Sequence, residues 1–368
     1  MTALAPYLLV GCVAAGLTWV LTPPVIALCR RIGALALPGD RKVHTIATPT
    51  LGGLAMWAGF LGALLVATRL QAFDGLFAFP SGAVGVAIGA TLMTAIGLVD
   101  DLKGLTAPAK LAAQILVAGV MTGTGVQVVS FWLPGQGTIG LSSDLAVVLT
   151  VAIVIFTVNA VNLVDGLDGL AAGLVAIGSA AYFIFSFRNA SNGLFSGTTP
   201  APMLAAATAG ACIGFLPHNF NPAKVFMGDT GAMLLGTLLA GATVTGIGHT
   251  TRPQLRDGFA LVIPVAIPLL VLALPFLDAT FAIFRRMRSR RGVMVADKAH
   301  LHHRLLEIGH SQRKTVLLLW LWSALPAAAT VALSIIGSRR VIPVFALVAL
   351  TGAVLLVAQN RRTGNKTV

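Results

Sequence analysis

Residues 145–170 read LAVVLTVAIVIFTVNAVNLVDGLDGL, an apolar run that ends in a regular series of polar side chains. No charged residue occurs between positions 145 and 164, and about 20 apolar residues suffice for a helix to cross a bilayer. Because residues three apart lie on the same side of a helix, this stretch predicts a membrane span that ends in a ladder of oxygen-bearing groups. The ladder consists of Asn159, Asn162, Asp165 and Asp168. A turn between two helices, built on the Asp-Gly pairs, is the structural alternative.

The rest of the chain has the same apolar character. Of its 368 residues, 57% are hydrophobic and 10% are charged, whereas soluble domains carry roughly 25% charged residues. A mean hydropathy of +0.89 rules out a water-soluble globule and a disordered chain. We therefore expect an all-α polytopic membrane protein with 10 or 11 transmembrane helices, forming one integral-membrane domain over residues 1–368. The predicted spans are 4–29, 51–70, 81–99, 111–132, 145–163, 169–187, 201–217, 230–249, 258–284, 315–337 and 341–359.

The positions of the basic residues predict the orientation of these spans. Of the 25 lysines and arginines, 19 fall in segments that follow odd-numbered spans, and basic residues gather on the cytoplasmic side. This places the N-terminus outside and the loop 285–314 in the cytoplasm. The first span has no basic stretch before it, so we expect a permanent span rather than a cleaved signal peptide. The net charge of +13 is explained by topology, and nucleic-acid binding is not expected.

The 12 acidic residues of the chain are informative because a carboxylate is costly to bury in a membrane. The predicted topology places eight of them on the cytoplasmic face. Several of these border the ends of apolar spans. The pattern favours a cytoplasmic-face site for a polyvalent cation or for phosphate groups.

The segment GLVDDLKGL, residues 97–105, closes the third predicted span with two adjacent carboxylates, Asp100 and Asp101. Neighbouring anions repel each other unless they share a cation. A divalent metal with phosphate oxygens would relieve that repulsion. The structural alternative is an acidic helix end in water.

The segment NFNPAKVFMGDTG, residues 219–231, places Asp229 at the start of the eighth predicted span. A helix N-terminus favours negative charge, so Asp229 is either a ligand-binding group or a simple N-cap.

A third segment, residues 297–306, reads DKAHLHHRLL and combines three histidines with an arginine. We interpret it as a donor cluster for phosphate or sugar rather than as a zinc site, which would want a further acid. A fourth, RKVH at 41–44, precedes PTLGG at 49–53. It is not a P-loop, because no G-x-x-x-x-G-K-[ST] is present.

Together the segments RKVH…PTLGG, GLVDDLKGL…K, NAVNLVDGLDGLAAG, NPAKVFMGDTG, PFLDAT and ADKAHLHHRLLEIG resemble the polyprenyl-phosphate N-acetylhexosamine-1-phosphate transferase family, the MraY/WecA superfamily. They occur in the family's order between about residue 40 and residue 310. The spaced motif His-Leu-His-His-Arg resembles the WecA/TagO-like branch rather than the MraY branch with its three consecutive histidines. The chain departs from the family pattern where Lys103 and Gly104 replace a third acid, and where Ala279 separates Asp278 from Thr280.

This resemblance implies transfer of GlcNAc-1-phosphate from UDP-GlcNAc to polyprenyl (undecaprenyl or decaprenyl) phosphate, with release of UMP. The reaction would be the first lipid-linked step of cell-envelope polysaccharide synthesis, at the inner (plasma) membrane of a bacterium. The implied cofactor is Mg²⁺, with Mn²⁺ as a substitute, and a homodimer is expected.

The site residues that we carry over fall into three groups. The catalytic group is Asp100, Asp101 and Asp229, and the metal ligands are Asp229 and Asn162. The substrate-binding group is Asp165, Asp168, Asn159, Asn219, His300, His302, His303, Arg304, Lys42 and Lys110.

Two alternatives stay open at this point. The first is the same chemistry with another UDP-N-acetylhexosamine donor, such as UDP-MurNAc-pentapeptide, against which the spaced histidines argue. The second is a secondary transporter, which would carry ionisable residues near the middle of the bilayer and broken helices in pairs.

Overall fold

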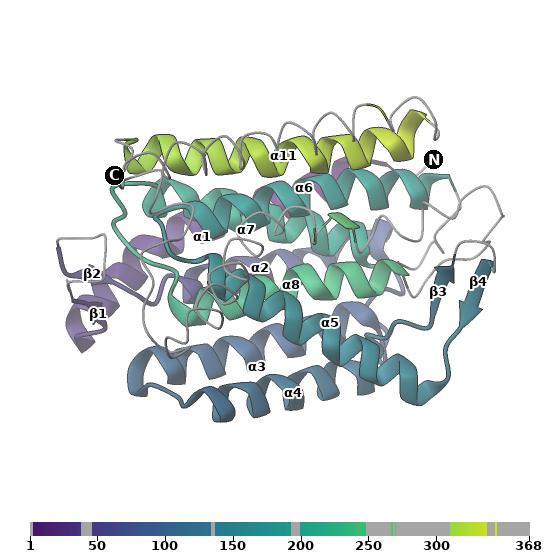
Figure 1. The fold of residues 1–368 in the computed structure, drawn as a ribbon, viewed down its shortest axis with the longest axis horizontal. Helices are drawn as coiled ribbons and strands as arrows, with labels where there is room; N and C mark the ends of the chain where they lie inside the picture. Colours follow the sequence, from purple (N-terminus) through teal and green to yellow (C-terminus); the bar gives the residue numbers. More distant parts are fainter. Residues whose placement is uncertain are drawn as a thin grey trace, which may run out of the picture.

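The computed structural model describes residues 3–37, 46–133, 137–192, 199–247, 266–267, 269, 310–336 and 343. In these residues the protein is a bundle of long helices with two small hairpins at its ends (Figure 1). The helices are α1 (Ala5–Ile32), α2 (Gly53–Ala67), α3 (Gly82–Lys103), α4 (Ala107–Gly123), α5 (Ser143–Val164), α6 (Leu170–Ser191), α7 (Ala201–Asn219), α8 (Gly228–Ile247) and α11 (Gln312–Ile336).

The helices agree with the membrane spans expected from the sequence. Seven of those described are long and apolar enough to cross a membrane, and α2 and α4 are shorter apolar helices. Together they match the first eight predicted spans and the tenth. The predicted spans 258–284 and 341–359 fall almost wholly outside the described residues. The total of 10 or 11 spans therefore stays a prediction, as does their orientation.

The expectation of an all-α chain is wrong in two short places. Strand β1 (Leu35–Ala36) pairs antiparallel with β2 (Thr48–Pro49), and β3 (Ser130–Leu133) pairs antiparallel with β4 (Gly137–Gly140). Helix α4 ends at Gly123, and the second hairpin begins at Ser130. The predicted span 111–132 is therefore too long at its carboxyl end. The chain then turns through Gly125, whose φ of 104° lies in a region that glycine adopts readily.

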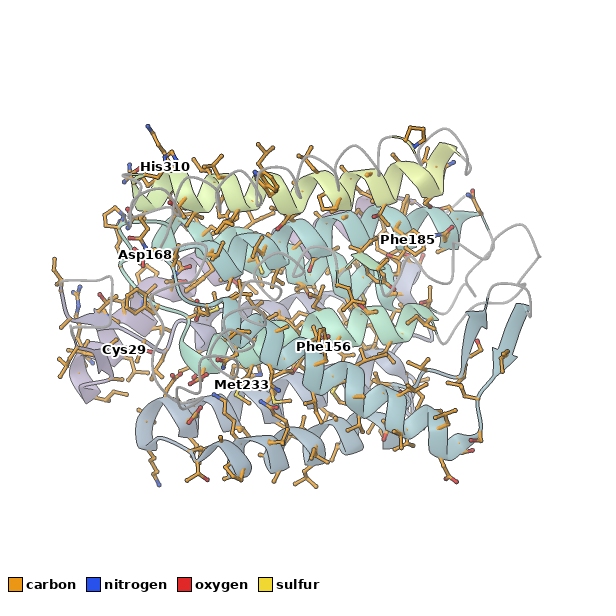
Figure 2. The ribbon with its side chains drawn as sticks, in the orientation of Figure 1. Cys29, Phe156, Asp168, Phe185, Met233 and His310 are labelled. Carbon is orange, nitrogen blue, oxygen red and sulfur yellow. The ribbon has the colours of Figure 1, made fainter. Side chains whose placement is uncertain are left out.

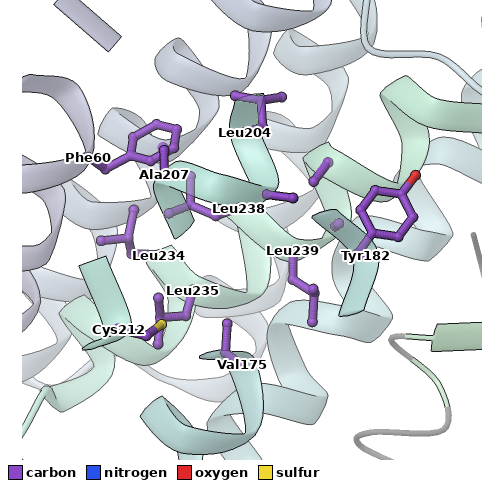
Figure 3. Close-up of a cluster of buried hydrophobic side chains, with 14 of the residues drawn as sticks. Phe60, Val175, Tyr182, Leu204, Ala207, Cys212, Leu234, Leu235, Leu238 and Leu239 are labelled. Atoms are coloured by element: carbon purple, nitrogen blue, oxygen red, sulfur yellow. The ribbon is translucent and has the colours of Figure 1, made fainter. Parts of the chain in front are cut away.

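Helix α8 lies at the centre of the bundle. It packs against α2, α3, α5, α6 and α7, and its apolar segment is completely buried. Figure 3 shows its leucines, Leu234, Leu235, Leu238 and Leu239, among side chains of α2, α6 and α7. A helix that is apolar on every side must be surrounded by apolar groups, and here other helices of the bundle supply them.

Glycines bring the first turn of α8 against the backbones of its neighbours. A Cβ atom on Gly97 of α3 would lie 2.6 Å from the carbonyl oxygen of Asp229. On the other side, a Cβ atom on Gly53 of α2 would collide with the backbone of Gly231. Small residues allow this close approach between membrane helices. The consequence is that the acidic end of α3 lies beside the amino end of α8.

We expect the substitution Gly97→Ala to lower the free energy of unfolding by about 1–3 kcal/mol, because the added methyl group forces α3 away from α8. The measurement is thermal unfolding of the purified protein in detergent. Gly119→Ala is the matched control, since a Cβ atom there meets no atom within 4 Å. Equal melting temperatures for the two variants would contradict the close packing of α3 on α8.

Candidate active site

One end of the bundle collects the polar residues that the sequence singled out. Helices α3 and α5 end there, and α4, α6, α8 and α11 begin there. In Figure 2 the label of Asp168 marks this end, and His310 lies at the same end.

Asp101 uses its carboxylate to cap α8. Its Oδ1 accepts a hydrogen bond from the backbone nitrogen of Asp229 at 2.9 Å. Its Oδ2 accepts one from the backbone nitrogen of Thr230 at 2.9 Å and one from the Thr230 hydroxyl at 2.6 Å. A helix N-terminus has backbone donors without partners inside the helix, and here a side chain from another helix supplies the acceptors.

Lys110 connects the other acid of the pair to α8. Its Nζ lies 2.6 Å from Oδ2 of Asp100 and 2.7 Å from Oδ1 of Asp229. Asp100 is fixed further, because its Oδ1 accepts a hydrogen bond from the backbone nitrogen of Leu105 at 2.7 Å. The Asp229 side chain is 32% exposed and that of Asp100 only 8%, so Asp229 is the more accessible carboxylate.

The two asparagines of α5 contact the helices that carry Asp229 and Lys110. The amide nitrogen of Asn162 donates to Oδ1 of Asp229. The amide nitrogen of Asn159 donates to Oε1 of Gln114 at 2.7 Å and to the carbonyl of Ile155 at 2.8 Å. Gln114 was missed by the sequence interpretation. Its signal was available, since it is a polar residue in an apolar run, one helical turn after Lys110.

The predicted ladder does not continue along one helix. Helix α5 ends at Val164, and α6 begins at Leu170 after a turn in which Gly169 has a φ of 79°. The expectation that all four polar residues share one helical face is therefore wrong for Asp165 and Asp168. The Asp-Gly pairs form the turn between helices instead.

Asp165 lies in this turn as a carboxylate surrounded by other carboxylates. Burial, followed by the negative charges of Asp229, Asp101 and Asp168, raises the pKa of Asp165 to about 7. Among the described residues, none donates a hydrogen bond to its side chain. The site therefore has a strong local excess of negative charge.

The loop after α7 fixes the last acid of the turn. Oδ2 of Asp168 accepts from the amide nitrogen of Asn221 at 2.9 Å and from the backbone nitrogen of Ala223 at 3.1 Å. Asn219 is buried, and both ends of its amide are used, since it accepts from the backbone of Gly169 and donates to the carbonyl of Val225. Asn219 thus joins the loop to the turn.

Several predicted residues lie outside the described residues, and their roles stay predictions. They are Lys42, His300, His302, His303 and Arg304.

The donor atoms at the acidic end fit a hard divalent cation. Carboxylate and amide oxygens of Asp229, Asn162 and Asp165 are the ligand types that Mg²⁺ prefers. Among the described residues no cluster of three or more His, Cys, Asp or Glu is placed to enclose a metal. Mg²⁺ is commonly held by one or two carboxylates together with substrate phosphates.

Comparison with known proteins places the chain in a family. The sequence profile of glycosyl transferase family 4 matches residues 83–247. A decaprenyl-phosphate N-acetylglucosaminephosphotransferase of Mycobacterium tuberculosis is 43% identical over 326 residues, which cover 87% of this chain and 80% of that protein. The chain belongs to glycosyl transferase family 4. The family 4 segment contains every carboxylate and asparagine of the site described above.

Two further relatives carry different names. A probable undecaprenyl-phosphate N-acetylglucosaminyl 1-phosphate transferase of Bacillus subtilis is 33% identical over 307 residues, covering 82% of this chain and 78% of that protein. A phospho-N-acetylmuramoyl-pentapeptide-transferase of Mycobacterium bovis is 34% identical over 362 residues, covering 87% of this chain and 94% of that protein.

We expect Asp101→Asn to lower the free energy of unfolding by about 1–2 kcal/mol, the usual effect of losing an N-cap. The substituted amide would turn an NH₂ group toward donors of α8 and leave at least one of them without an acceptor. Thermal unfolding in detergent measures the effect. Asp74→Asn is the control, because Asp74 is exposed and follows the far end of α2. Asp101→Asn melting like this control would contradict the capping role.

The raised pKa of Asp165 predicts a pH dependence of stability. Between about pH 4 and pH 7 the folded protein keeps a proton that the unfolded chain, with an ordinary pKa of 3.8, has released. The free energy of unfolding should therefore fall as pH rises through this range. In EDTA, melting curves recorded between about pH 5 and pH 8 should show this slope for the wild type and a shallower one for Asp165→Asn. Parallel curves would show that Asp165 titrates normally.

Proposed function

We propose that this protein transfers GlcNAc-1-phosphate from UDP-GlcNAc to a polyprenyl phosphate. The products are UMP and polyprenyl-diphosphate-GlcNAc, which would begin a lipid-linked polysaccharide of the cell envelope. The observation that carries the proposal is the contact of Lys110 with both Asp100 and Asp229 at the end of a buried apolar bundle. The names of the relatives from M. tuberculosis and B. subtilis support the choice of reaction.

In this reaction an oxygen of the lipid phosphate attacks the phosphorus that carries the sugar. A new P–O bond forms, and the bond between that phosphorus and the UMP oxygen breaks. Both substrates are anionic, and catalysis of such transfers depends mainly on positioning and on stabilising negative charge. A site that combines an ammonium group with carboxylates suits this demand.

Asp229 and Asn162 are the residues that would hold Mg²⁺, with Mn²⁺ as a substitute. When bound, the cation supplies positive charge to the donor diphosphate. Lys110 has three N–H donors, two of which contact Asp100 and Asp229, and it can redirect one of them to an incoming phosphate. Asn162 keeps its amide carbonyl for a ligand, because its contact with Asp229 uses the nitrogen.

The geometry supports different roles for the two adjacent acids. The carboxylate of Asp101 already accepts three hydrogen bonds from α8, so we assign it to positioning Asp229. Asp100 faces Lys110, and we assign it to orienting the lipid phosphate. That phosphate is largely ionised at neutral pH, so no strong base is required.

The remaining predicted contacts are assigned by their position. Asp165 and Asp168 lie in the turn after α5, and we assign them to contacts with the nucleotide. Asn159 is exposed on α5, and we assign it to the same substrate. Asn219, with both ends of its amide engaged, acts by shaping this turn. Lys42 and the histidine motif at 300–304 are expected to contact the phosphates or the sugar.

Two features favour UDP-GlcNAc over UDP-MurNAc-pentapeptide as the donor. The identity to the M. tuberculosis GlcNAc enzyme is 43%, against 34% for the muramoyl-pentapeptide transferase. The spaced histidines also follow the GlcNAc branch. A transporter is disfavoured, because the acids of the described helices lie at helix ends and none lies near mid-span: Asp100, Asp101 and Asp229 are at the site, and Asp144 is at the opposite end of α5.

We place the site at the cytoplasmic face of a bacterial plasma membrane, with the N-terminus outside. This orientation rests on the excess of lysine and arginine in the segments on the site's side. The apolar helices support a multi-pass membrane protein. A homodimer remains our expectation from the family resemblance.

The test is a turnover assay with purified protein in detergent, Mg²⁺ and polyprenyl phosphate. Labelled UDP-GlcNAc and UDP-MurNAc-pentapeptide are offered separately, and release of UMP is followed. We expect product from UDP-GlcNAc. Asp229→Asn should lower kcat by about 100-fold or more, because it removes a charged group from the reacting centre.

Asp74→Asn is the charge-matched control for this substitution and should keep wild-type turnover. Product only from UDP-MurNAc-pentapeptide would overturn the assignment of the donor. Full turnover by Asp229→Asn would overturn the role of the metal-binding acid.

A further inference from the structure

A line of polar contacts connects the first turn of α11 to Asp168. The amide nitrogen of Asn221 donates to Oδ2 of Asp168 at 2.9 Å and to Oε1 of Gln312 at 2.7 Å. One residue further along α11, Nε of Arg313 donates to the backbone carbonyl of Asn221 at 2.7 Å. The start of α11 therefore holds both the side chain and the backbone of Asn221.

The contact with Gln312 fixes the Asn221 amide on the side away from Asp168. An amide NH₂ group has two N–H donors, and here Asp168 takes one and Gln312 the other. If the Gln312 oxygen were removed, the Asn221 amide would be held on one side only, by Asp168. The amide and the carboxylate could then turn together, and Asp168 would lose part of its fixed orientation.

Apolar and aromatic contacts keep α11 in place over this loop. The rings of Trp320 and Phe220 lie 5.5 Å apart, and the Trp320 indole nitrogen donates to the carbonyl of Leu170 at 3.4 Å. Gly173 of α6 makes room for the indole, since any Cβ atom there would overlap it. The helix is thus anchored on α6, directly beside the turn that carries Asp168.

Asp168 keeps one oxygen for a ligand. Both of its contacts with Asn221 and Ala223 use Oδ2, and no described residue donates to Oδ1. A carboxylate held in this way presents a directed acceptor to N–H or O–H groups, such as those of a nucleoside base or ribose.

We propose that Gln312 is a positioning residue for nucleotide binding, which acts through Asn221 on Asp168, with Arg313 as its support. This inference rests on the proposed function for the identity of the nucleotide. It assigns to the last described helix a part in recognising the donor substrate, although Gln312 itself touches no reacting group.

The test compares Gln312→Leu, which keeps the size of the side chain and removes the acceptor, with Lys314→Ala as the matched control. Lys314 lies on the same turn and is exposed. We expect Gln312→Leu to raise KM for UDP-GlcNAc by about 5- to 10-fold, the effect of one lost hydrogen bond. KM for polyprenyl phosphate and kcat should change less than about twofold, since the contacts of Lys110 are untouched.

Gln312→Glu keeps an acceptor oxygen and should recover most of the wild-type KM. Calorimetric binding of UMP gives a readout without turnover, and the Kd for UMP should rise in Gln312→Leu in parallel with KM. An unchanged Kd would overturn the inference. A lower kcat together with an equal rise in KM for both substrates and a lower melting temperature would also overturn it. That result would indicate only a structural role for Gln312.

The two proposals fail in distinguishable ways. A wild-type protein that turns over neither UDP-sugar overturns the proposed function. The role of Gln312 is then judged by UMP binding alone, and a wild type that binds no UMP overturns that role as well.

Discussion

The carboxylate of Asp101 satisfies the amino end of a helix that is buried on every side. A helix begins with backbone N–H groups that have no partner within it, and such groups are costly in an apolar environment where water cannot reach them. In α8 the requirement is met from another helix, because two of these N–H groups and the Thr230 hydroxyl donate to one side chain of α3. The glycine contacts between α3 and α8 are what bring that side chain close enough. The position of Asp229, and with it the rest of the site, depends on this cap.

The same cap explains the electrostatics of the site. Because Asp101 is committed to the backbone of α8, Lys110 is shared between Asp100 and Asp229, and Asp165 is left in a negative field. In the described region, one ammonium group therefore faces several carboxylates. An anionic diphosphate would be repelled by this surface unless a cation entered with it. This is a physical reason to propose a metal ion that accompanies the diphosphate.

The sequence predicted the elements whose signals are local. Apolar runs located the nine α-helices of the part of the chain that the structure describes, and Asp229 was correctly expected at the start of α8. The pairing of Asp101 with the α8 backbone could not be predicted, because it joins residues 128 positions apart. It also depends on close packing at glycines, which no sequence pattern indicates. The ladder from Asn159 to Asp168 was extended too far, because a three-residue period continues through a turn as readily as through a helix. Gln312 was missed because a single amide in a basic segment carries no motif, and Gln114 was missed although it is a polar residue in an apolar run.

The attachment of Asp168 to α11 has a consequence for how the protein is made. Chains are synthesised from the amino end, so α5, α6 and α7 with their loops emerge well before residue 312. Until then Asn221 lacks both of its α11 partners, Gln312 and Arg313. A nascent chain that already contains Asp100, Lys110 and Asp229 thus still lacks the contacts that hold Asn221 against Asp168. The contacts that hold Asn221, and through it Asp168, are complete only when α11 has been synthesised and has packed on α6.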